Sequence, residues 1–224
     1  MRILIVTQYF WPETFRINEI VLFLEEKGYS VDVLTGDPNY PSGKIFKEYK
    51  ENKKKFSKYS KSNIYRVPIF PRGSASPIRL FFNYLSYVLS AIFIGFFKLR
   101  NRRYDVVFTF ATSPISVAIP SLFFCWIKKS KHILWVLDLW PDILEELNIV
   151  KNRFVRNKLH QTINYIYRKS DIILAQSKGF VNTIRSRVEN KEKVHLFYSW
   201  YEQLKPHVDY FEPNNVKKKF NIVF

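Results

Sequence analysis

The alternation of short apolar segments with longer helical patterns is the feature that most constrains how this chain can fold. Segments of strand length are apolar at residues 1–7, 31–35, 63–68, 104–110, 133–137, 171–175 and 194–198. Amphipathic patterns, or uncharged stretches of helical length, separate most of these segments. This order of strand and helix is typical of a parallel sheet with helices on both faces. The sequence therefore predicts an α/β fold with a doubly wound parallel sheet.

The first helix and the loop before it show what kind of site the opening of the chain can form. Apolar residues from Ile17 to Leu24 recur at helical spacing, and Gly28 is suited to end that helix. The loop before it, residues 8–16, contains no glycine. A G-x-G-x-x-G dinucleotide site is excluded, because its glycines let backbone N–H groups approach a pyrophosphate.

The same loop carries three consecutive aromatic residues, Tyr9, Phe10 and Trp11. Aromatic rings are suited to stacking on a flat or apolar ligand, and Glu13 and Arg16 would add polar contacts. The alternative is that the rings only plug the space between loops. We expect a binding loop here.

Residues 133–144, ILWVLDLWPDIL, predict a buried strand followed by a candidate site and a helix. Pro141 suits the first turn of that helix, and Asp142 places negative charge near its positive end. Ligands of doubly wound sheets bind outside the carboxyl ends of the strands, which makes Asp138, Trp140 and Asp142 candidate site residues. As alternatives, Asp138 caps the helix, Asp142 only complements its dipole, and Trp140 belongs to the core.

The charge and the cysteine count narrow the class of partner. A net charge of +17 predicts attraction to phosphates of a lipid surface, a nucleic acid or a small molecule. No nucleic-acid-binding motif is present, so we expect no nucleic-acid partner. The single cysteine, Cys125, excludes an intrachain disulfide, and the four histidines lack metal-ligand spacing, so we expect no metal site. Since Met1 opens directly on a strand pattern, we expect a cytoplasmic protein.

Residues 37–62 are rich in lysine, with few acidic residues from Lys44 onward. Such a run is usually a solvated surface segment without regular structure. It could also serve as an electrostatic contact with an anionic partner. We expect a loop here.

Residues 80–97 form an uncharged stretch of 18 residues, long enough to cross a bilayer. Predicted strands at 63–68 and 104–110 flank it, and a spanning helix would separate them if they share one sheet. We therefore expect a crossover helix lying at the inner face of the plasma membrane; a buried helix and a true span are the alternatives. The expected membrane contacts are Phe93, Phe96, Phe97, Lys98, Arg100, Arg102 and Arg103.

Five segments, taken in order, resemble the N-terminal half of a family 4 glycosyltransferase. They are ILIVTQYFWPETFRINEI, VLTGDPNYPSGKIF, YDVVFTFATSPIS, WVLDLWPD and SWYEQLKP. The chain is most similar to the subgroup that transfers N-acetyl-aminosugars, such as fucosamine, during synthesis of bacterial surface polysaccharides. The resemblance covers essentially the whole chain.

This resemblance implies a GT-B architecture, in which two Rossmann-like domains face each other across a cleft. Residues 1–211 would be the acceptor-binding domain, and residues 212–224 a linker and the first strand of a donor-binding domain. The chain would then be a truncated or split enzyme. The family's chemistry is retaining, metal-independent transfer from a nucleotide-sugar, which is a substrate, so no cofactor is expected.

Two departures from the family pattern affect the site residues. The glycine-rich loop of the wider family is Pro12-Glu13-Thr14-Phe15 here, and its strand-end histidines are replaced by Thr112-Ser113-Pro114 and Asp138. No catalytic histidine is therefore expected.

The leading hypothesis is the acceptor-binding half of such a transferase. Its partners would be a lipid-linked sugar acceptor, an anionic membrane surface and a donor-binding domain encoded separately. The alternative is a glycolipid-binding module without catalysis. The expected catalytic residues are Asp138 and Glu13, and the expected acceptor-binding residues are Tyr9, Phe10, Trp11, Arg16, Ser113, Trp140 and Asp142.

Overall fold

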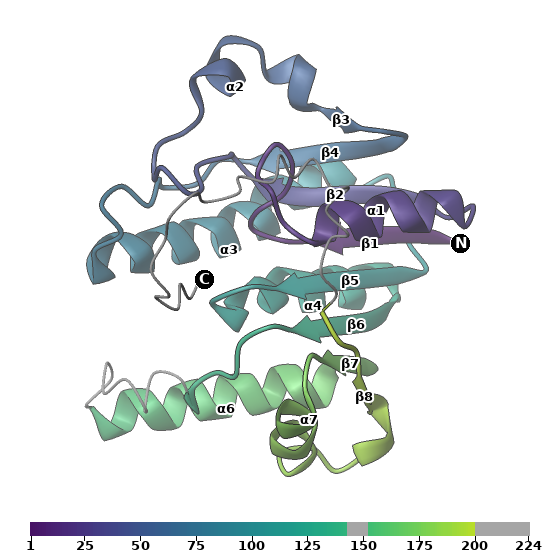
Figure 1. Ribbon diagram of the computed structural model, residues 1–224, viewed down its shortest axis with the longest axis vertical. Coiled ribbons are helices and arrows are strands. Elements are labelled where there is room, and N and C mark those ends of the chain that lie inside the picture. The colour runs from purple at the N-terminus through teal and green to yellow at the C-terminus, as the bar shows by residue number, and fades with distance from the viewer. Residues whose placement is uncertain (143–151, 200–224) are drawn as a thin grey trace, which may run out of the picture.

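The computed structural model describes residues 1–142 and 152–199, and the described strands form one eight-stranded sheet (Figure 1). The strand order is β3-β4-β2-β1-β5-β6-β7-β8, and all neighbours pair in parallel except β3 and β4. The strands are β1 (Arg2–Val6), β2 (Ser30–Gly36), β3 (Lys58–Tyr59), β4 (Ser62–Val67), β5 (Val106–Ala111), β6 (Lys131–Val136), β7 (Ile172–Ala175) and β8 (Val194–Leu196). The predicted doubly wound parallel sheet is confirmed.

Helices cover both faces of this sheet (Figure 1). One face packs on α1, and the other packs on α3, α4 and α6, with an apolar core under each layer. The helices are α1 (Ile17–Glu26), α2 (Lys47–Glu51), α3 (Pro77–Leu99), α4 (Ala118–Lys128), α6 (Arg153–Lys169) and α7 (Lys178–Arg185), with 3₁₀ turns η1 (Lys53–Phe56), η2 (Ile115–Val117) and η3 (Lys191–Lys193). The expected short helix that begins near Pro141 lies mostly outside the described residues, as does the expected linker at 212–224.

The end of α1 follows the expectation drawn from Gly28. Its φ is +82°, a conformation that glycine adopts without steric cost. The N–H of Tyr29 donates to the carbonyl of Leu24 at 3.0 Å, and the N–H of Gly28 donates to that of Glu25 at 3.0 Å. These two bonds form a Schellman motif, which turns the chain from α1 into β2.

The expected loop at residues 37–62 is wrong, because this segment contains α2, η1 and β3. Tyr49 and Phe56 are buried and pack edge-to-face at 5.8 Å between ring centroids. Beneath them, the buried Arg66 guanidinium donates to the carbonyls of Gly36 at 2.8 Å and of Trp11. Two aromatic anchors and one buried arginine therefore hold a lysine-rich insertion against the sheet edge.

The uncharged stretch at residues 80–97 belongs to α3. By length and composition α3 is the one helix among the described residues that could cross a membrane. It connects β4 to β5, and both strands belong to the same sheet. The buried hydroxyl of Tyr87 donates to the carbonyl of Thr7, at the end of β1, at 2.9 Å. This packing makes α3 a crossover helix, as its flanking strands predicted.

Candidate functional site

The candidate site lies where the strand order reverses. The chain runs from β1 outward to β2 and β4 and then returns to β5 on the other side of β1. In doubly wound sheets the crevice outside the carboxyl ends of two such strands is the usual ligand site. A cavity of about 680 Å³ opens here. It is lined from the loops after β1, β2, β4, β5 and β6 and from α1 and α3, and its volume is typical of a small-molecule site.

One wall of the cavity is a cluster of aromatic rings. Tyr9 stacks on Phe15 with 5.4 Å between the ring centroids. The ring centroid of Tyr40 lies 5.5 Å from that of Tyr9 and 5.2 Å from that of Phe15. The guanidinium of Arg72 lies 5.1 Å from the ring centre of Tyr40 and 5.8 Å from that of Tyr9. Burial raises the pKa of Tyr9 well above its usual value, so its hydroxyl stays neutral. The wall presents apolar faces with one cation held against them.

The carboxyl group of Asp138 belongs to the lining of the same cavity. This residue lies two positions beyond the end of β6, lines the cavity and is partly buried. In the part of the chain that the structure describes, its side chain makes no hydrogen bond or ion pair. Beside it, the indole N–H of Trp140 donates to the Ser113 hydroxyl at 3.0 Å, which ties the loop after β6 to the loop after β5. Ser113 lines the cavity as well.

Glu13 lies in the loop after β1, but its carboxylate points at backbone rather than at the cavity. One oxygen accepts from the N–H groups of Asn39 at 2.9 Å and Tyr40 at 2.7 Å, and the other from that of Phe10 at 3.2 Å. The residue is 2% exposed. Burial raises the pKa of Glu13 to about 7, although the three donors and Arg66 oppose that rise. Glu13 thus joins the loop after β1 to the loop that carries Tyr40.

The structure separates the expected aromatic trio. Tyr9 lines the cavity, whereas Phe10 is fully buried on the α1 side of the sheet and packs edge-to-face on Tyr59 at 5.3 Å. Trp11 contacts Tyr59 at 5.6 Å and Phe56 at 5.3 Å, within the lysine-rich insertion. Phe10 and Trp11 therefore fill space between loops, which was the alternative expectation, whereas the position of Tyr9 fits stacking on a ligand. A ligand contact by Phe10 or Trp11 stays a prediction.

Two further expected residues, Arg16 and Asp142, differ in their relation to the cavity. Arg16 lines it and pairs with Glu19 at 2.9 Å, with both side chains about one third exposed. Asp142 does not line it; its carboxylate accepts from the Arg187 guanidinium at 2.5 Å, and Arg187 also donates to the carbonyl of Trp140 at 3.1 Å. The structure thus gives Asp142 a charged partner from the segment after α7, a contact that the sequence pattern did not indicate.

Sequence reasoning missed Tyr40, Arg72 and Tyr84 as lining residues. Tyr84 lies on α3 next to Asn83, and the fully buried Asn83 amide accepts from Gln8 at 2.7 Å and donates to the carbonyl of Phe70 at 2.6 Å. The amide of Asn83 within an uncharged stretch was the available signal, since a buried amide usually faces a polar partner. Arg72 and Tyr40 lie in turn-rich loops that gave no such signal.

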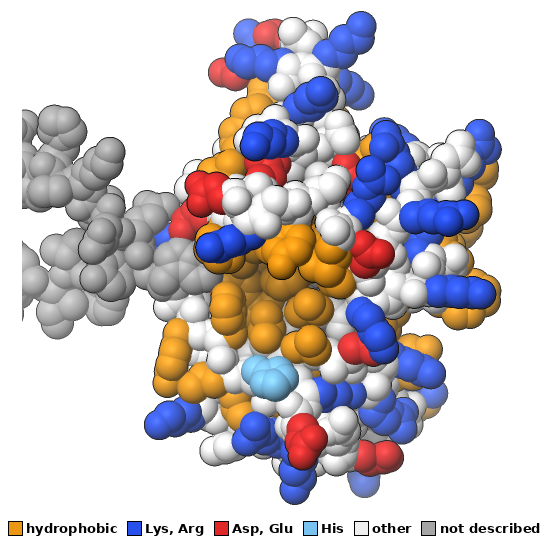
Figure 2. All heavy atoms as spheres, turned by 90° about the vertical axis from the view of Figure 1, so that its right-hand side faces the viewer, with side chains coloured by type: hydrophobic (Ala, Val, Ile, Leu, Met, Phe, Trp, Pro, Cys, Tyr) orange, Lys and Arg blue, Asp and Glu red, His pale blue; other side chains and the backbone are white. Residues whose placement is uncertain are grey.

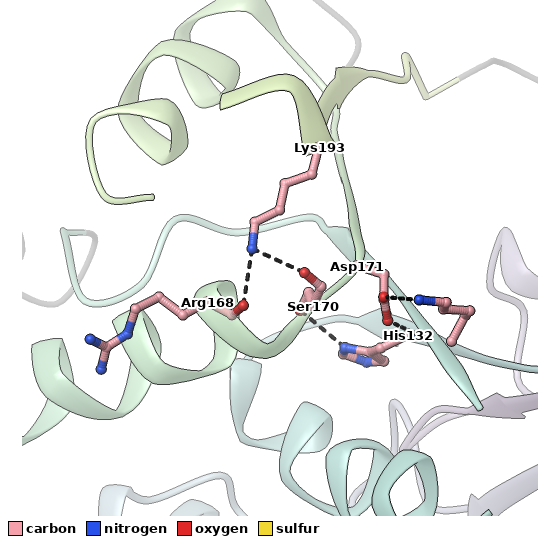
Figure 3. A network of polar contacts seen from close by, with 6 residues as sticks. His132, Arg168, Ser170, Asp171 and Lys193 are labelled. Atoms are coloured by element: carbon pink, nitrogen blue, oxygen red, sulfur yellow. Dashed lines mark hydrogen bonds and ion pairs between the residues drawn. The ribbon is translucent and has the colours of Figure 1, made fainter. Parts of the chain in front are cut away.

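A second polar network lies at the opposite, amino edge of the sheet (Figure 3). The imidazole of the buried His132 lies 2.8 Å from the Thr109 hydroxyl and 3.0 Å from the Ser170 hydroxyl. Asp171 accepts from the backbone N–H of His132 at 2.8 Å, and Lys193 donates to three carbonyls around the end of α6. This network joins β6, β7 and α6 and contributes nothing to the cavity.

No cluster of three or more metal-ligating side chains occurs within residues 1–142 and 152–199. Transfer without a metal stays a prediction, since a sugar diphosphate could bring its own cation.

Comparison with known proteins gives the fold a context. No sequence-family profile matches the chain, and no curated protein matches it in sequence. Among solved structures it is similar to LpCGTa in complex with UDP, with a TM-score of 0.54, 10% identity and coverage of 91% of this chain and 55% of that one. It is also similar to UGT2 of Phytolacca americana, with a TM-score of 0.51, 10% identity and coverage of 89% of this chain and 52% of that one. The calicheamicin glycosyltransferase CalG4 has a TM-score of 0.50, 8% identity and coverage of 84% of this chain and 51% of that one.

The chain spans about half the length of these solved chains. At such identities the likeness shows the fold alone. The described residues adopt the Rossmann-like fold of one half of a GT-B architecture, as the resemblance in sequence implied.

Proposed function

We propose that this chain is the acceptor-binding half of a retaining, nucleotide-sugar-dependent glycosyltransferase. We further propose, from the resemblance in sequence, that it acts in bacterial surface polysaccharide synthesis on a lipid-linked sugar. Activity would require a donor-binding domain on the other side of the cleft. The observation that carries this proposal is the Asp138 carboxylate, which has no partner among the described residues, in an aromatic-lined cavity at the strand switch point.

The cavity offers the contacts that an acceptor sugar needs. The rings of Tyr9, Phe15 and Tyr40 present apolar faces on which the C–H face of a sugar can pack. The guanidinium groups of Arg16 and Arg72 line the same cavity and suit hydroxyl or phosphate oxygens of the acceptor. A sugar bound in this cavity would share it with the Asp138 side chain, which also lines it.

In this proposal Asp138 has the catalytic role. Its carboxylate accepts a hydrogen bond from the attacking acceptor hydroxyl, orients it, and stabilises the loss of its proton as the new glycosidic bond forms. Glu13 acts indirectly, because its carboxylate accepts three backbone N–H bonds that hold Tyr40 and the loop after β1 in place. It is a positioning residue here, and direct contact with the acceptor stays a separate prediction.

The experiment is a binding titration combined with a reconstituted reaction. Calorimetry with a short-chain lipid-diphosphate sugar should show binding that Arg72→Ala weakens about tenfold, as expected for loss of a charge-assisted contact. Lys178→Ala is the matched control, since Lys178 begins α7 outside the cavity lining. Fusion to the donor-binding half of a relative should then yield sugar transfer. Absence of binding by the wild-type chain would contradict the proposal.

The alternative function, a glycolipid-binding module without catalysis, is favoured by one observation. Aromatic rings and two guanidinium groups, which suit the sugar and phosphate of a glycolipid head group, line the cavity of this chain. The fused enzyme separates the two functions, because a binding module would retain the titration result and show no turnover.

A further inference from the structure

We propose that the outward face of α3, continued by Trp126 of α4, is a docking surface for an anionic lipid bilayer. The surface is defined by side chains and charge alone, so it stands whether or not the proposed function holds. If that function does hold, the surface places the acceptor cavity beside the membrane that carries the lipid-linked sugar.

The outward face of α3 is apolar along its whole length. Ile78 is 71% exposed, Phe81 60%, Leu89 46%, Phe93 63% and Phe97 65%. At about 1.5 Å of rise per residue, the stripe from Ile78 to Phe97 is roughly 28 Å long. Single apolar residues scattered on a protein surface do not form a continuous stripe of this length. Apolar side chains in water at this density indicate a surface that is covered in use.

The opposite stripe of α3 fastens the helix to the sheet, so the apolar face cannot turn inward. Tyr87, Ala91 and Leu99 are buried against the sheet. At Gly95, an added Cβ would lie 3.1 Å from Leu34 and 3.2 Å from Phe124, which shows how closely the helix approaches β2 and α4. The helix has two different faces, and residues 1–142 and 152–199 cover only one of them.

The apolar stripe continues onto α4. The ring of Phe96 meets that of Phe123 at 6.3 Å, and Trp126, one turn further along α4, is 77% exposed. Tryptophan favours the level of the lipid head groups, where an apolar ring with one N–H donor is well solvated. The ammonium of Lys128 donates to the carbonyls of Leu99 and Arg100 at 2.8 Å each and locks the end of α3 to α4.

Charge identifies the occupant as an anionic bilayer. No acidic residue occurs from position 77 to 103, and exposed basic residues follow the apolar stripe at its end, namely Lys98, Arg100, Arg102, Arg103 and Lys129. Hydrophobic and basic side chains lie together along the margin of the molecule that belongs to the α3 and α4 side (Figure 2). An apolar stripe beside a cluster of cations is the pattern of a helix lying in the interface of an anionic membrane.

A crossing of the membrane is ruled out by the strands that α3 joins. Both β4 and β5 pair within one parallel sheet, with β2 and β1 between them. The helix therefore lies along the lipid surface. Tyr84 lines the cavity from α3, and the next residue, Leu85, is 40% exposed on the apolar face. The cavity lining and the docking surface thus include neighbouring residues of one turn of α3.

The test is co-flotation of the full chain with lipid vesicles of phosphatidylcholine, alone or mixed equally with phosphatidylglycerol. We expect binding only to the mixed vesicles at low salt. Phe93→Glu with Phe97→Glu should lower the partition coefficient about a hundredfold or more, since two large apolar side chains leave the lipid. Arg100→Gln with Arg102→Gln and Arg103→Gln should lower it about a hundredfold at low salt, and less at high salt.

The matched controls are substitutions on surfaces that do not contact the bilayer in this proposal. Phe23→Glu changes a ring on α1 that is 55% exposed on the other face of the sheet. Lys53→Gln with Lys54→Gln and Lys55→Gln removes the same number of charges from η1. Both controls should bind vesicles within about threefold of the wild type, given the modest long-range attraction that their charges contribute.

Three results would overturn the docking surface. The first is equal loss of vesicle binding in the α3 variants and in the controls, which would show attraction by net charge only. The second is absence of wild-type binding to mixed vesicles. The third is a wild-type dimer in sedimentation that Phe93→Glu with Phe97→Glu converts to a monomer while vesicle binding persists, which would assign the face to a second copy. Thermal melts confirm that each variant is folded.

Discussion

The two edges of the sheet place ionisable groups in opposite situations. At the amino edge, His132, Asp171 and Lys193 have their polar atoms matched by partners from β5, β6 and the end of α6. Figure 3 shows the contacts with β6 and the end of α6. At the carboxyl edge, Glu13 is equally well matched, but the Asp138 carboxylate faces a cavity without a partner among the described residues. A satisfied buried network stabilises a fold, whereas a carboxylate left open to a cavity is available for a ligand.

The two edges also differ in the direction in which burial shifts the pKa of an ionisable group. Burial lowers the pKa of His132 to about 4 and raises that of Glu13 to about 7. Burial therefore disfavours the charged form of each group, one at each edge of the sheet. Their contributions to stability change with pH in opposite senses over nearly the same range, so each is best seen when the other is removed.

The largest expected effect is on Asp138. In an enzyme fused to a donor-binding half, Asp138→Asn should lower the transfer rate by about two orders of magnitude or more, since the amide cannot accept a proton. Acceptor affinity should change little, because the amide oxygen still accepts a hydrogen bond. Initial rates and calorimetric binding on the same protein separate the two quantities. Full activity of this variant would remove Asp138 from the chemistry.

The second expected effect concerns the amino edge. The Ser170 hydroxyl donates to the carbonyl of Ile166 at 2.8 Å, so Nδ1 of His132 donates to Ser170 and Nε2 accepts from Thr109. A second proton on Nε2 would displace the bond from Thr109 and place a charge in a buried site, which burial disfavours. The unfolded chain binds that proton below about pH 6.5 and the folded chain only below about pH 4, so acid should cost about 3 kcal/mol of stability across this range.

The measurement is urea unfolding at a series of pH values with His132→Gln as the comparison. The variant starts less stable, because glutamine cannot reproduce both contacts of the ring. Its free energy of unfolding should nevertheless lack the acid-induced fall attributed to His132. A wild type and a variant with parallel pH profiles would contradict the buried neutral imidazole.

The third effect has similar size and opposite sign. The folded pKa of Glu13 lies near 7 and the usual value near 4.5, so the folded chain holds a proton that the unfolded chain has already released. The stability that Glu13 contributes is complete below pH 4.5 and is lost as pH rises through 7, with a change of about 3 kcal/mol. In the same series of urea unfolding experiments, Glu13→Gln should abolish this loss of stability with rising pH. A Glu13→Gln protein whose stability still falls between pH 5 and 7 would assign the proton to another group.

Much of the fold was predictable because parallel strands buried on both faces and crossover helices carry strong periodic signals. The segment from Lys47 to Tyr59 was not predictable. Its anchors, Tyr49 and Phe56, are seven residues apart among lysines, and they form a core only by meeting Arg66 and Trp11 from distant parts of the chain. Local composition contains no trace of such a contact.

The site was predictable where it depends on strand ends. Asp138, Ser113, Tyr9 and Arg16 follow β6, β5 and β1, and the topology brings them to one cavity. Which face of its loop a residue presents was not predictable, since Tyr9 and Phe10 are neighbours that point to different sides of the sheet. That choice depends on the ring of Tyr59 and on the hydrogen bonds of Glu13, which only tertiary structure supplies.

The smallest effect distinguishes the second strand-end carboxylate from the first. Asp142 pairs with Arg187 at 2.5 Å, with 34% and 14% of the two side chains exposed, and it lies outside the cavity lining. Asp142→Asn keeps a hydrogen-bond acceptor but leaves the guanidinium without a counter-charge, so we expect a loss of about 1 kcal/mol of stability. Urea unfolding of Asp142→Asn, Arg187→Gln and the double variant should give a coupling energy of similar size. In the fused enzyme the transfer rate of Asp142→Asn should stay within about twofold of the wild type, because the residue touches neither the cavity nor Asp138. A stable but inactive Asp142→Asn enzyme, together with an active but less stable Asp138→Asn enzyme, would exchange the roles of the two carboxylates.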